Sequence, residues 1–569
     1  MPDNNRNLCV FAQDEEKHFI RIKCQFDLNT SKHLYLSKWR PGRYEFGDFA
    51  KNIKNLRVFD SNNIEIQVFK KERNCWELIN FNGGKVYIEY SYYSKDLNAG
   101  STYSGETYFY VNPINCVLFN EEIHDRQWEI KLDIPENWKL AGVASKANPF
   151  LIENFDRLAD TPFIASPNLV CLKYTVDDIH FSIWFNEQLS IPKDKLVNDF
   201  TKFTKRQLQD FRYFPSKNFE FLVITTDHFS YHGVEHLTST MITLGPKYAV
   251  FNSLYTELLG VSSHELYHVW NVKAFRPKEM TPYNFGSENY SRFGYIYEGI
   301  TTYLGDLYLL KSGVFYENQY FLELEKQIEK HALNEGRFHY SLGDSSIDTW
   351  IDGYQQGTPG RKVSIYTEGC LFALLLDIEL IRLSDATKSI SDFMQLMLRN
   401  KNHGYDLGMV LTLLNELVPN DWEAFFKNKI DFPCDFIPLL STALNHIGIS
   451  LLASPSKTRT EEWLAVKILN KEKNEISYVH KKGFGEHIGL QVGDKILSIN
   501  GIELNADFDN WLSYFKEEEI TLILQRGKNL LPISFKFTNG AYQQIPKYSL
   551  LLISSPEKNQ TKYYNHWKK

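Results

Sequence analysis

The stretch Gly260-Val-Ser-Ser-His-Glu-Leu-Tyr-His-Val-Trp-Asn-Val-Lys-Ala-Phe-Arg-Pro277 decides the fold of this 569-residue chain. Read as a helix, it places His264 and His268 one turn apart on a single face, where both imidazoles can reach one metal ion. Glu265 lies at the edge of that face, where it can contact a water molecule bound to the same ion. This spacing is typical of the metal-binding helix of a zinc peptidase.

A catalytic zinc ion takes three protein ligands and leaves one position open, so two histidines are not enough. Between Tyr295 and Leu310, apolar residues recur at helical spacing. Glu298, near the start of this predicted helix, is the expected third ligand. With 16 His and 70 acidic residues in the chain, chance gives about 0.06 His-Glu-x-x-His patterns per chain. The alternative is a pair of ordinary helix histidines beside a surface glutamate.

Neighbouring residues extend the pattern beyond the metal ligands. His264-Glu-x-x-His268-x-Trp270-Asn271, Arg276-Pro277 and Glu298-Gly299-Ile300-Thr301 together resemble the glycyl aminopeptidase family of gluzincin zinc metallopeptidases, which carry a PDZ domain. The resemblance implies a multidomain α+β fold. We therefore expect an N-terminal antiparallel β-sandwich domain, a thermolysin-like catalytic domain with a helical extension, and a C-terminal PDZ domain.

Composition limits the classes of function. A hydrophobic content of 43% and a net charge of −7 indicate a globular protein without a basic face for nucleic acid or anionic membranes. Seven scattered cysteines without Cys-x-x-Cys pairs argue against a disulfide framework and a cysteine zinc site. The N-terminus lacks the apolar core of a signal peptide and no segment is long enough to span a membrane, so a cytoplasmic location is the default expectation. A leader removed before this numbering would change that expectation.

Four regions are expected along the chain. Residues 1–172 alternate apolar and polar side chains, as in Phe19–Phe26 and Lys85–Tyr93, and predict the β domain. Residues 173–440 form the predicted catalytic domain, in which a helix is expected from Pro192 to Phe211 and a Gly- and Asp-rich loop from Gly343 to Gly360. Residues 441–540 form the predicted PDZ domain and 541–569 a tail made of a docking strand and a frayed end. Two further segments look like sequence motifs of the same family, Trp39-Arg-Pro-Gly-Arg-Tyr44 and Leu158-Ala-Asp-Thr-Pro162. No catalytic role is assigned to them.

His228, His232 and His236 would form a metal stripe on a helix, but Gly233 makes a helix unlikely there. Gly233-Val-Glu235-His236 instead resembles the exopeptidase motif of related aminopeptidases. The resemblance implies that Glu235 binds the substrate's α-ammonium group, because a carboxylate in a partly desolvated cleft can hold it with a charge-assisted hydrogen bond. The alternative for Glu235 is a solvated turn residue.

A third segment, Val363-Ser-Ile-Tyr-Thr-Glu-Gly369, looks like the family's Ile-Ser-Tyr-Tyr-x-Lys-Gly stretch. Tyr366 is therefore the expected donor to the oxyanion that forms during hydrolysis, although it could serve only in packing. Ile365 and Glu368 depart from the family pattern, which puts the inherited substrate preference in doubt.

Near the C-terminus, His446-Ile-Gly-Ile449 fits the carboxylate-binding loop of a PDZ domain, and Gly489-Leu-Gln-Val-Gly-Asp494 resembles a bacterial PDZ turn. Such a loop can capture the C-terminus of a peptide, yet a purely structural PDZ domain is nearly as consistent with the sequence.

The resulting hypothesis is a zinc aminopeptidase acting on peptides with a free N-terminus, with Glu265 as general base. An endopeptidase or dipeptidase on the same scaffold and a catalytically weak PDZ peptide-binding protein are the alternatives. The preferred N-terminal residue and the oligomeric state are not readable from the sequence.

Overall fold

The computed structural model describes residues 6–143, 147–355, 357–401, 404–454, 456–470, 474–537 and 542–569. The chain divides into two compact units. The larger unit comprises Met1–Tyr320, Tyr340–Cys434 and Tyr563–Lys569, and the smaller one Phe321–His339 and Asp435–Lys562. The larger unit holds a β-rich region followed by a mixed sheet with many helices, which agrees with the expected α+β class.

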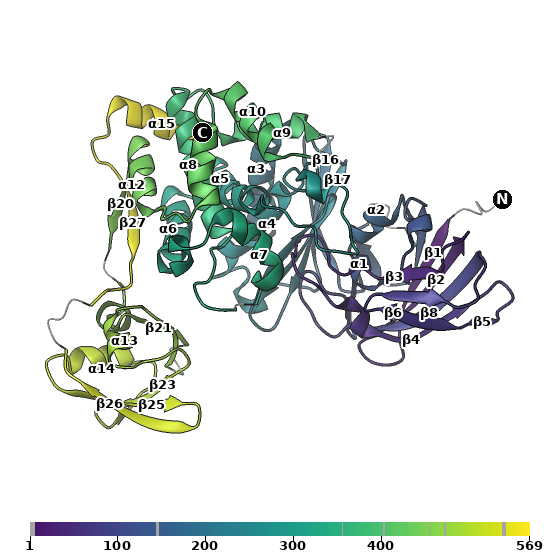
Figure 1. The fold of residues 1–569 in the computed structure, drawn as a ribbon, viewed down its shortest axis with the longest axis horizontal. Helices are drawn as coiled ribbons and strands as arrows, with labels where there is room; N and C mark the ends of the chain where they lie inside the picture. The colour runs from purple at the N-terminus through teal and green to yellow at the C-terminus, as the bar shows by residue number, and fades with distance from the viewer. Residues whose placement is uncertain are drawn as a thin grey trace. The chain divides into compact units, whose positions relative to one another are not determined.

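The β-rich region begins with a seven-stranded sheet in the order β13-β11-β1-β2-β8-β4-β5, drawn mainly in purple and blue (Figure 1). Strands β2 and β8 coincide with the predicted alternating segments, because every second side chain faces the core. All neighbours pair antiparallel except β1 and β11, which are parallel. The strands are β1 Asn7–Gln13, β2 Phe19–Leu28, β4 Ile53–Phe59, β5 Glu65–Ile66, β8 Gly84–Tyr93, β11 Trp128–Asp133 and β13 Phe150–Ile152.

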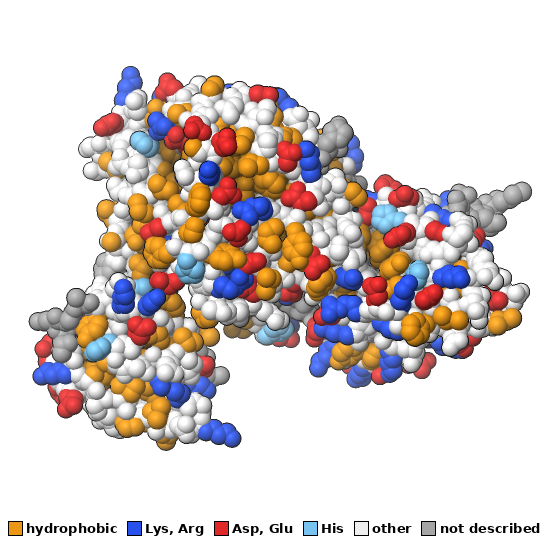
Figure 2. Space-filling view, viewed as in Figure 1, with side chains coloured by type: hydrophobic (Ala, Val, Ile, Leu, Met, Phe, Trp, Pro, Cys, Tyr) orange, Lys and Arg blue, Asp and Glu red, His pale blue; other side chains and the backbone are white. Residues whose placement is uncertain are grey.

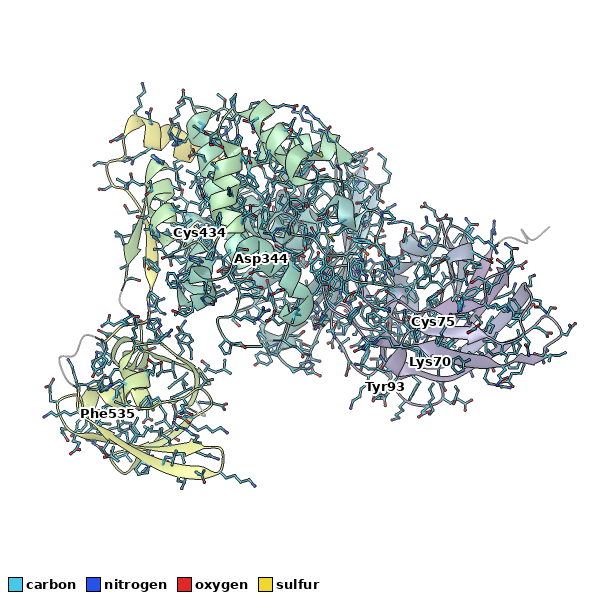
Figure 3. The ribbon with its side chains drawn as sticks, viewed as in Figure 1. Lys70, Cys75, Tyr93, Asp344, Cys434 and Phe535 are labelled. Atoms are coloured by element: carbon cyan, nitrogen blue, oxygen red, sulfur yellow. The ribbon has the colours of Figure 1, made fainter. Side chains whose placement is uncertain are left out.

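Two smaller sheets complete this region. One has the order β12-β14-β10-β9 and the other β3-β7-β6, and Figure 3 marks Lys70 on β6 and Cys75 on β7. Phe11 of β1 packs edge-on against Phe163 of β14 with ring centroids 5.6 Å apart, so different sheets share one core, as expected for a sandwich. The elements are β3 His33–Tyr35, η1 Phe49–Asn52, β6 Val68–Glu72, β7 Cys75–Leu78, β9 Tyr103–Ser104, β10 Phe109–Val111, α1 Pro113–Cys116, η2 Glu121–Ile123, β12 Lys139–Ala141, α2 Phe155–Ala159 and β14 Phe163–Ser166.

A five-stranded mixed sheet follows in the order β15-β16-β17-β19-β18. Its three central strands are parallel, while β15 and β18 pair antiparallel at the two edges. Helix α3, Lys193–Phe211, joins β16 to β17 as predicted and buries one apolar face. The strands are β15 Val170–Val176, β16 Ile179–Phe185, β17 Asn218–Thr225, β18 Ser230–Glu235 and β19 Ser239–Gly245.

Helices follow the mixed sheet, and Figure 1 shows α5 next to α4 and α8. Helix α4 contacts β18 and β19, whereas the π-helical turn η5 crosses α8. The crossing is close, because a Cβ on Gly299 would lie 2.4 Å from Cα of Gly369. The helices are η3 Lys247–Ala249, α4 Tyr255–Tyr267, η4 Lys278–Met280, η5 Tyr295–Ile300, α5 Thr301–Lys311, α6 Glu317–Leu333, η6 Glu335–Phe338, α7 Leu342–Asp352, α8 Thr367–Leu383, α9 Ile390–Arg399, α10 Leu407–Leu417, α11 Trp422–Phe426 and η8 Lys427–Asp431.

One predicted loop is wrong over most of its length. Residues 343–360, rich in Gly and Asp, were expected to lack regular structure, but α7 occupies Leu342–Asp352. The side chain of Ser341 accepts a hydrogen bond from the backbone of Asp344, and Trp350 is buried on the inner face. A cap and an apolar anchor thus outweigh the low helix propensity of Gly and Asp.

The smaller unit contains the predicted PDZ sheet, in the order β21-β22-β23-β25-β26 with β24 paired to β23, and a separate pair β20-β27. One apolar core joins the sheet to α13 and α14. The elements are α12 Ile437–His446, β20 Ile449–Ala453, η9 Thr460–Leu464, β21 Val466–Asn470, β22 Glu475–Val479, α13 Phe484–His487, β23 Lys495–Ile499, β24 Ile502–Glu503, α14 Phe508–Tyr514, β25 Ile520–Arg526, β26 Asn529–Phe535 and β27 Tyr548–Leu552. The last helix, α15 Lys558–Lys568, starts in this unit, and its residues from Tyr563 onward belong to the larger one.

The predicted carboxylate-binding loop His446–Ile449 is wrong. It ends α12 and enters β20, which pairs with β27 and lies outside the PDZ sheet. The residue directly before the edge strand β21 is Ala465, which has a φ of 56°. Short apolar-Gly-apolar patterns occur in many turns, so the pattern by itself could not locate the loop.

The predicted frayed end is also wrong, because α15 covers Lys558–Lys568. Trp567 of this helix is fully buried, and its Nε1 donates a hydrogen bond to Oη of Tyr303 at 2.8 Å. The docking strand is confirmed as β27, Tyr548–Leu552. The domain boundaries expected at 172, 440 and 540 remain predictions.

Charged residues of both signs are mixed on the face of the larger unit that Figure 2 shows. This distribution agrees with the mild net charge of the chain. Within the described residues, no helix combines the length and apolar character needed to cross a membrane.

Candidate active site

The side chains of His264, His268 and Glu298 converge. Nε2 of His264 and Nε2 of His268 lie 3.0 Å apart, and Oε2 of Glu298 lies 3.7 Å from the first and 3.4 Å from the second. Ligands about 2.0–2.1 Å from a tetrahedral zinc ion are on the order of 3.3 Å from one another. The three donor atoms therefore fit one zinc ion.

Local structure fixes the orientation of these ligands. Nδ1 of His268 lies 2.7 Å from the carbonyl oxygen of Asn271, which suits donation from Nδ1 and leaves the Nε2 lone pair free for a metal. The Asn271 amide in turn donates to the carbonyl oxygen of Ile296, at 2.8 Å, in the turn that carries Glu298. That turn is π-helical, a form often found at functional sites.

The electrostatics of His268 and Glu298 favour a positive charge between them, whereas burial lowers the pKa of His264. Burial opposes the charged form of His268, but the carboxylate of Glu298 raises the pKa of this imidazole to about 10. Burial also opposes the charged form of Glu298, and His268 and His264 lower its pKa to about 2. A shared cation, whether a proton or a divalent metal ion, satisfies all three groups.

Glu265 is buried on the same helix, and its Oε2 has no hydrogen-bond partner in the described protein. Burial raises the pKa of its carboxyl group, and the nearby Glu235 and Glu298 raise it further. Gly233 makes room for this side chain, because a Cβ there would lie 2.1 Å from Oε1 of Glu265. Gly233, a residue of the predicted substrate-binding motif, thus contacts Glu265, the predicted general base.

Glu235 ends strand β18 and also faces this cluster. Glu235, Glu265 and His268 each offer a ligand atom within 4.8 Å of the others. Oε1 of Glu235 is buried without a hydrogen-bond partner. The extended strand explains why His232 and His236 form no helical stripe, and within the described residues they belong to no metal-type cluster.

Tyr366 precedes α8 and is half-buried near the same site, where Glu298 and Glu235 act on it electrostatically. Its hydroxyl lies 3.4 Å from that of Tyr354, which sequence reasoning did not single out. Of the two departures from the family pattern, Ile365 packs near Gly294, and Glu368 is buried and accepts a hydrogen bond from the backbone of Ser364 at 2.7 Å.

The β-rich region contributes residues that the sequence did not assign to the site. The Tyr44 hydroxyl donates to Oε1 of Glu298 at 3.3 Å, across 254 positions of sequence. Gly42 lies against Glu235, since a Cβ on it would be 2.4 Å from Oε2. In the sequence, the only sign of these contacts was the resemblance of Trp39–Tyr44 to a motif of the family. That resemblance singled out the segment but did not show that it reaches the active site.

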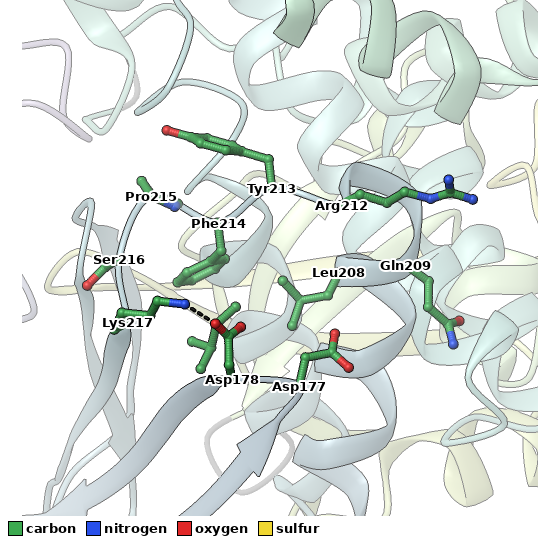
Figure 4. A pocket seen from close by; sticks show the side chains of 11 residues that line it. Asp177, Asp178, Leu208, Gln209, Arg212, Tyr213, Phe214, Pro215, Ser216 and Lys217 are labelled. Atoms are coloured by element: carbon green, nitrogen blue, oxygen red, sulfur yellow. Dashed lines mark hydrogen bonds and ion pairs between the residues drawn. The ribbon is translucent and has the colours of Figure 1, made fainter.

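A separate hollow of about 720 Å³ lies at the end of α3 and is shown in Figure 4. Lys217 and Asp178 form an exposed ion pair at its rim. None of the predicted site residues lines it. The candidate site is therefore the convergent cluster around α4 and not this surface hollow.

Comparison with known proteins agrees with this architecture. The family model "M61 glycyl aminopeptidase" matches residues 257–372, "Peptidase M61 N-terminal domain" matches 7–167, and "PDZ domain" matches 475–526. No match was found among curated proteins.

One solved structure shows the same overall fold. A crystal structure of an aminopeptidase N family protein from Idiomarina loihiensis aligns with a TM-score of 0.88 at 23% identity, over 98% of this chain and 99% of that one. An M1 zinc metallopeptidase from Deinococcus radiodurans, bound to a Tyr-Ser-Ala substrate, aligns at a TM-score of 0.46 and 10% identity, over 74% of this chain and 92% of that one. The second alignment is too distant to support an argument.

The fold, the helix with its two histidines and the family matches define a metallopeptidase of the aminopeptidase type. With both of its characteristic domains and the PDZ domain present, the chain belongs to the M61 glycyl aminopeptidase family.

Proposed function

We propose that the protein is a zinc-dependent aminopeptidase that removes N-terminal residues from peptides. The observation that carries this proposal is the arrangement of three donor atoms, 3.0–3.7 Å apart, beside two buried carboxylates with unpartnered oxygens. The donors His264, His268 and Glu298 would hold the zinc ion. When bound, zinc polarises the scissile carbonyl and lowers the pKa of water.

The protein's own side chains supply the proton transfers and the positioning. Glu265 accepts a proton from the attacking water at its unpartnered Oε2 and later delivers it to the leaving amine. The hydroxyl of Tyr366 donates to the oxygen on which negative charge develops. Glu235 binds the α-ammonium group of the substrate with Oε1, which makes the enzyme an exopeptidase.

The variant Glu265→Gln tests the chemical step. We expect zinc content equal to wild type and a fall in kcat of about 10²–10⁴-fold on aminoacyl amides, because the metal ligands stay while the base is lost. Undiminished turnover, or wild-type protein that neither binds zinc nor cleaves peptides, would overturn the proposal.

Blocking the substrate's amine separates the proposal from an endopeptidase on the same scaffold. N-acetylated peptides should resist cleavage, since an acetylated amine has no charge to offer Glu235. Rapid cleavage of blocked peptides would instead indicate an endopeptidase. Peptide capture by the PDZ domain remains a separate prediction.

A further inference from the structure

Arg40 is a buried cation that has no carboxylate partner in the described protein. It lies in the loop between β3 and η1 and is only 4% exposed. Among the described residues, the one hydrogen bond of its side chain runs from Nη1 to the carbonyl oxygen of Pro41 at 3.3 Å. Within the described residues, no carboxylate oxygen lies within the 4.0 Å of an ion pair. Its neighbour Arg43, in contrast, is paired with Glu45.

An unpaired buried charge is costly, and arginine cannot relieve the cost by losing its proton. Burial disfavours the charged form and lowers the pKa of the Arg40 guanidinium, with Arg43 acting in the same direction. A site that keeps such a charge is suited to a ligand that brings the counter-ion with it.

Arg40 lies within electrostatic range of the active site. It interacts electrostatically with Glu235 and with Glu265. Two residues further on, Gly42 packs directly against the Glu235 carboxylate. Around Glu235 the site therefore offers one unpartnered anion, at Oε1, and one cation without an acidic partner. A short peptide carries the matching charges at its two ends.

We propose that Arg40 binds the C-terminal carboxylate of short peptides, so that the enzyme prefers di- or tripeptides with a free carboxylate. The planar guanidinium fork matches a carboxylate with two parallel hydrogen bonds, which a lysine cannot reproduce. This inference rests on the proposed aminopeptidase function, in which Glu235 holds the other end of the same peptide.

Gly100 fixes the position of the guanidinium. A Cβ on Gly100 would lie 1.8 Å from Nη2 of Arg40, so a larger residue must displace the arginine. The glycine itself cannot retreat freely, because its N–H donates to Asn98 at 3.0 Å and its carbonyl accepts from Asn115 at 2.8 Å. Gly100→Ala therefore moves the cation without removing its charge.

The test compares kcat/KM of the zinc-loaded enzyme for Ala-Ala, Ala-Ala-Ala and their C-terminal amides. We expect the wild-type enzyme to have a higher kcat/KM for the free acid than for the amide of at least one of the two lengths. The substitution Arg40→Gln should lower kcat/KM about 30–100-fold for that free acid and less than about threefold for its amide. Gly100→Ala should reproduce this loss. Arg43→Gln, which removes an equal charge nearby, should retain the preference.

Binding of the intact peptides to Glu265→Gln, measured by calorimetry, separates recognition from turnover. In the double variant that adds Arg40→Gln to Glu265→Gln, binding of the free acid should weaken and binding of the amide should stay unchanged. Zinc content and melting temperature check that the variant is folded. Equal losses for acid and amide, or no preference at either length, would overturn the inference while leaving the aminopeptidase proposal intact. Absence of all peptide hydrolysis would instead contradict the proposed function itself.

Discussion

Nζ of Lys273 lies 2.7 Å from Oδ1 of Asp160, and both side chains are nearly buried. Asp160 belongs to the β-rich region, whereas Lys273 follows the helix that carries His264 and His268. The same carboxylate also accepts a hydrogen bond from the backbone of Leu237 at 2.9 Å, directly after Glu235 and His236. One aspartate thus holds the strand end that presents Glu235.

Replacing this aspartate should reduce both stability and substrate binding. We expect Asp160→Asn to lower the free energy of unfolding by about 3–5 kcal/mol, because Lys273 would be left as an unpaired buried charge. KM for peptides should rise as Glu235 loses its support. Denaturant unfolding and steady-state kinetics measure the two effects.

Asp178→Asn provides the matched control. Asp178 pairs with Lys217 at the surface, where both side chains are about 70% exposed. Loss of such a pair costs less than about 1 kcal/mol. Equal destabilisation by the two substitutions would contradict the role given to Asp160.

The contribution of Asp160 should depend on pH. Burial acts to raise the pKa of its carboxyl group, but Lys273 and His236 outweigh burial and lower it. A lowered folded-state pKa gives stability that is complete above the unfolded value, about 3.9, and is lost as the pH falls below it. The difference in unfolding free energy between wild type and Asp160→Asn should therefore be constant from about pH 5 to 7 and shrink below about pH 4. A difference that grows on acidification would contradict this assignment.

Glu298→Gln should weaken zinc binding without unfolding the protein. Loss of a residue that only supports a metal ligand costs about 10–100-fold in affinity, so loss of a charged ligand should cost more than about 100-fold. A chelator should lower the melting temperature of wild type and leave that of the variant almost unchanged. Metal analysis after dialysis gives the direct measurement, and full zinc retention would remove Glu298 from the ligand set.

Tyr366→Phe should lower kcat by about 10²-fold with little change in KM, because the hydroxyl contributes chiefly in the transition state. Tyr354→Phe is the natural comparison, since the two hydroxyls lie 3.4 Å apart. A larger fall in kcat for Tyr354→Phe than for Tyr366→Phe would indicate that Tyr354 is the donor to the oxyanion.

Gly233→Ala should lower kcat while zinc content stays normal. The added methyl group would lie 2.1 Å from Oε1 of Glu265 and must push the base from its place. Gly260→Ala tests whether any added methyl group near α4 has this effect, because its nearest neighbour would be an ordinary 3.6 Å away. We expect Gly260→Ala to behave like wild type.

Local patterns predicted much of the fold. Alternating apolar and polar residues predicted β2 and β8, and the pattern of strands with a helix between them predicted α3, because these signals depend on residues close together in the chain. The histidines and Glu298 were predicted because their spacing reflects the demands of one ion.

Other parts of the site could not be predicted, since they depend on contacts between distant segments. Tyr44 reaches Glu298 across 254 positions, and Asp160 reaches Lys273 across 113. No pattern of neighbours encodes such pairs. Helix α7 was missed because its local composition favoured a loop. The burial of Trp350 and the cap at Ser341 stabilise the helix in spite of that composition.

The loop that carries Arg40, Gly42 and Tyr44 has a practical consequence for protein engineering. A fragment trimmed to the segment with the metal-binding motif would lack the residues that contact Glu298 and Glu235 from the β-rich region. Modular transplants between relatives should therefore move the β-rich segment and the peptidase segment as a matched pair, and chimaeras that mix parents should show altered selectivity even where every metal ligand is retained.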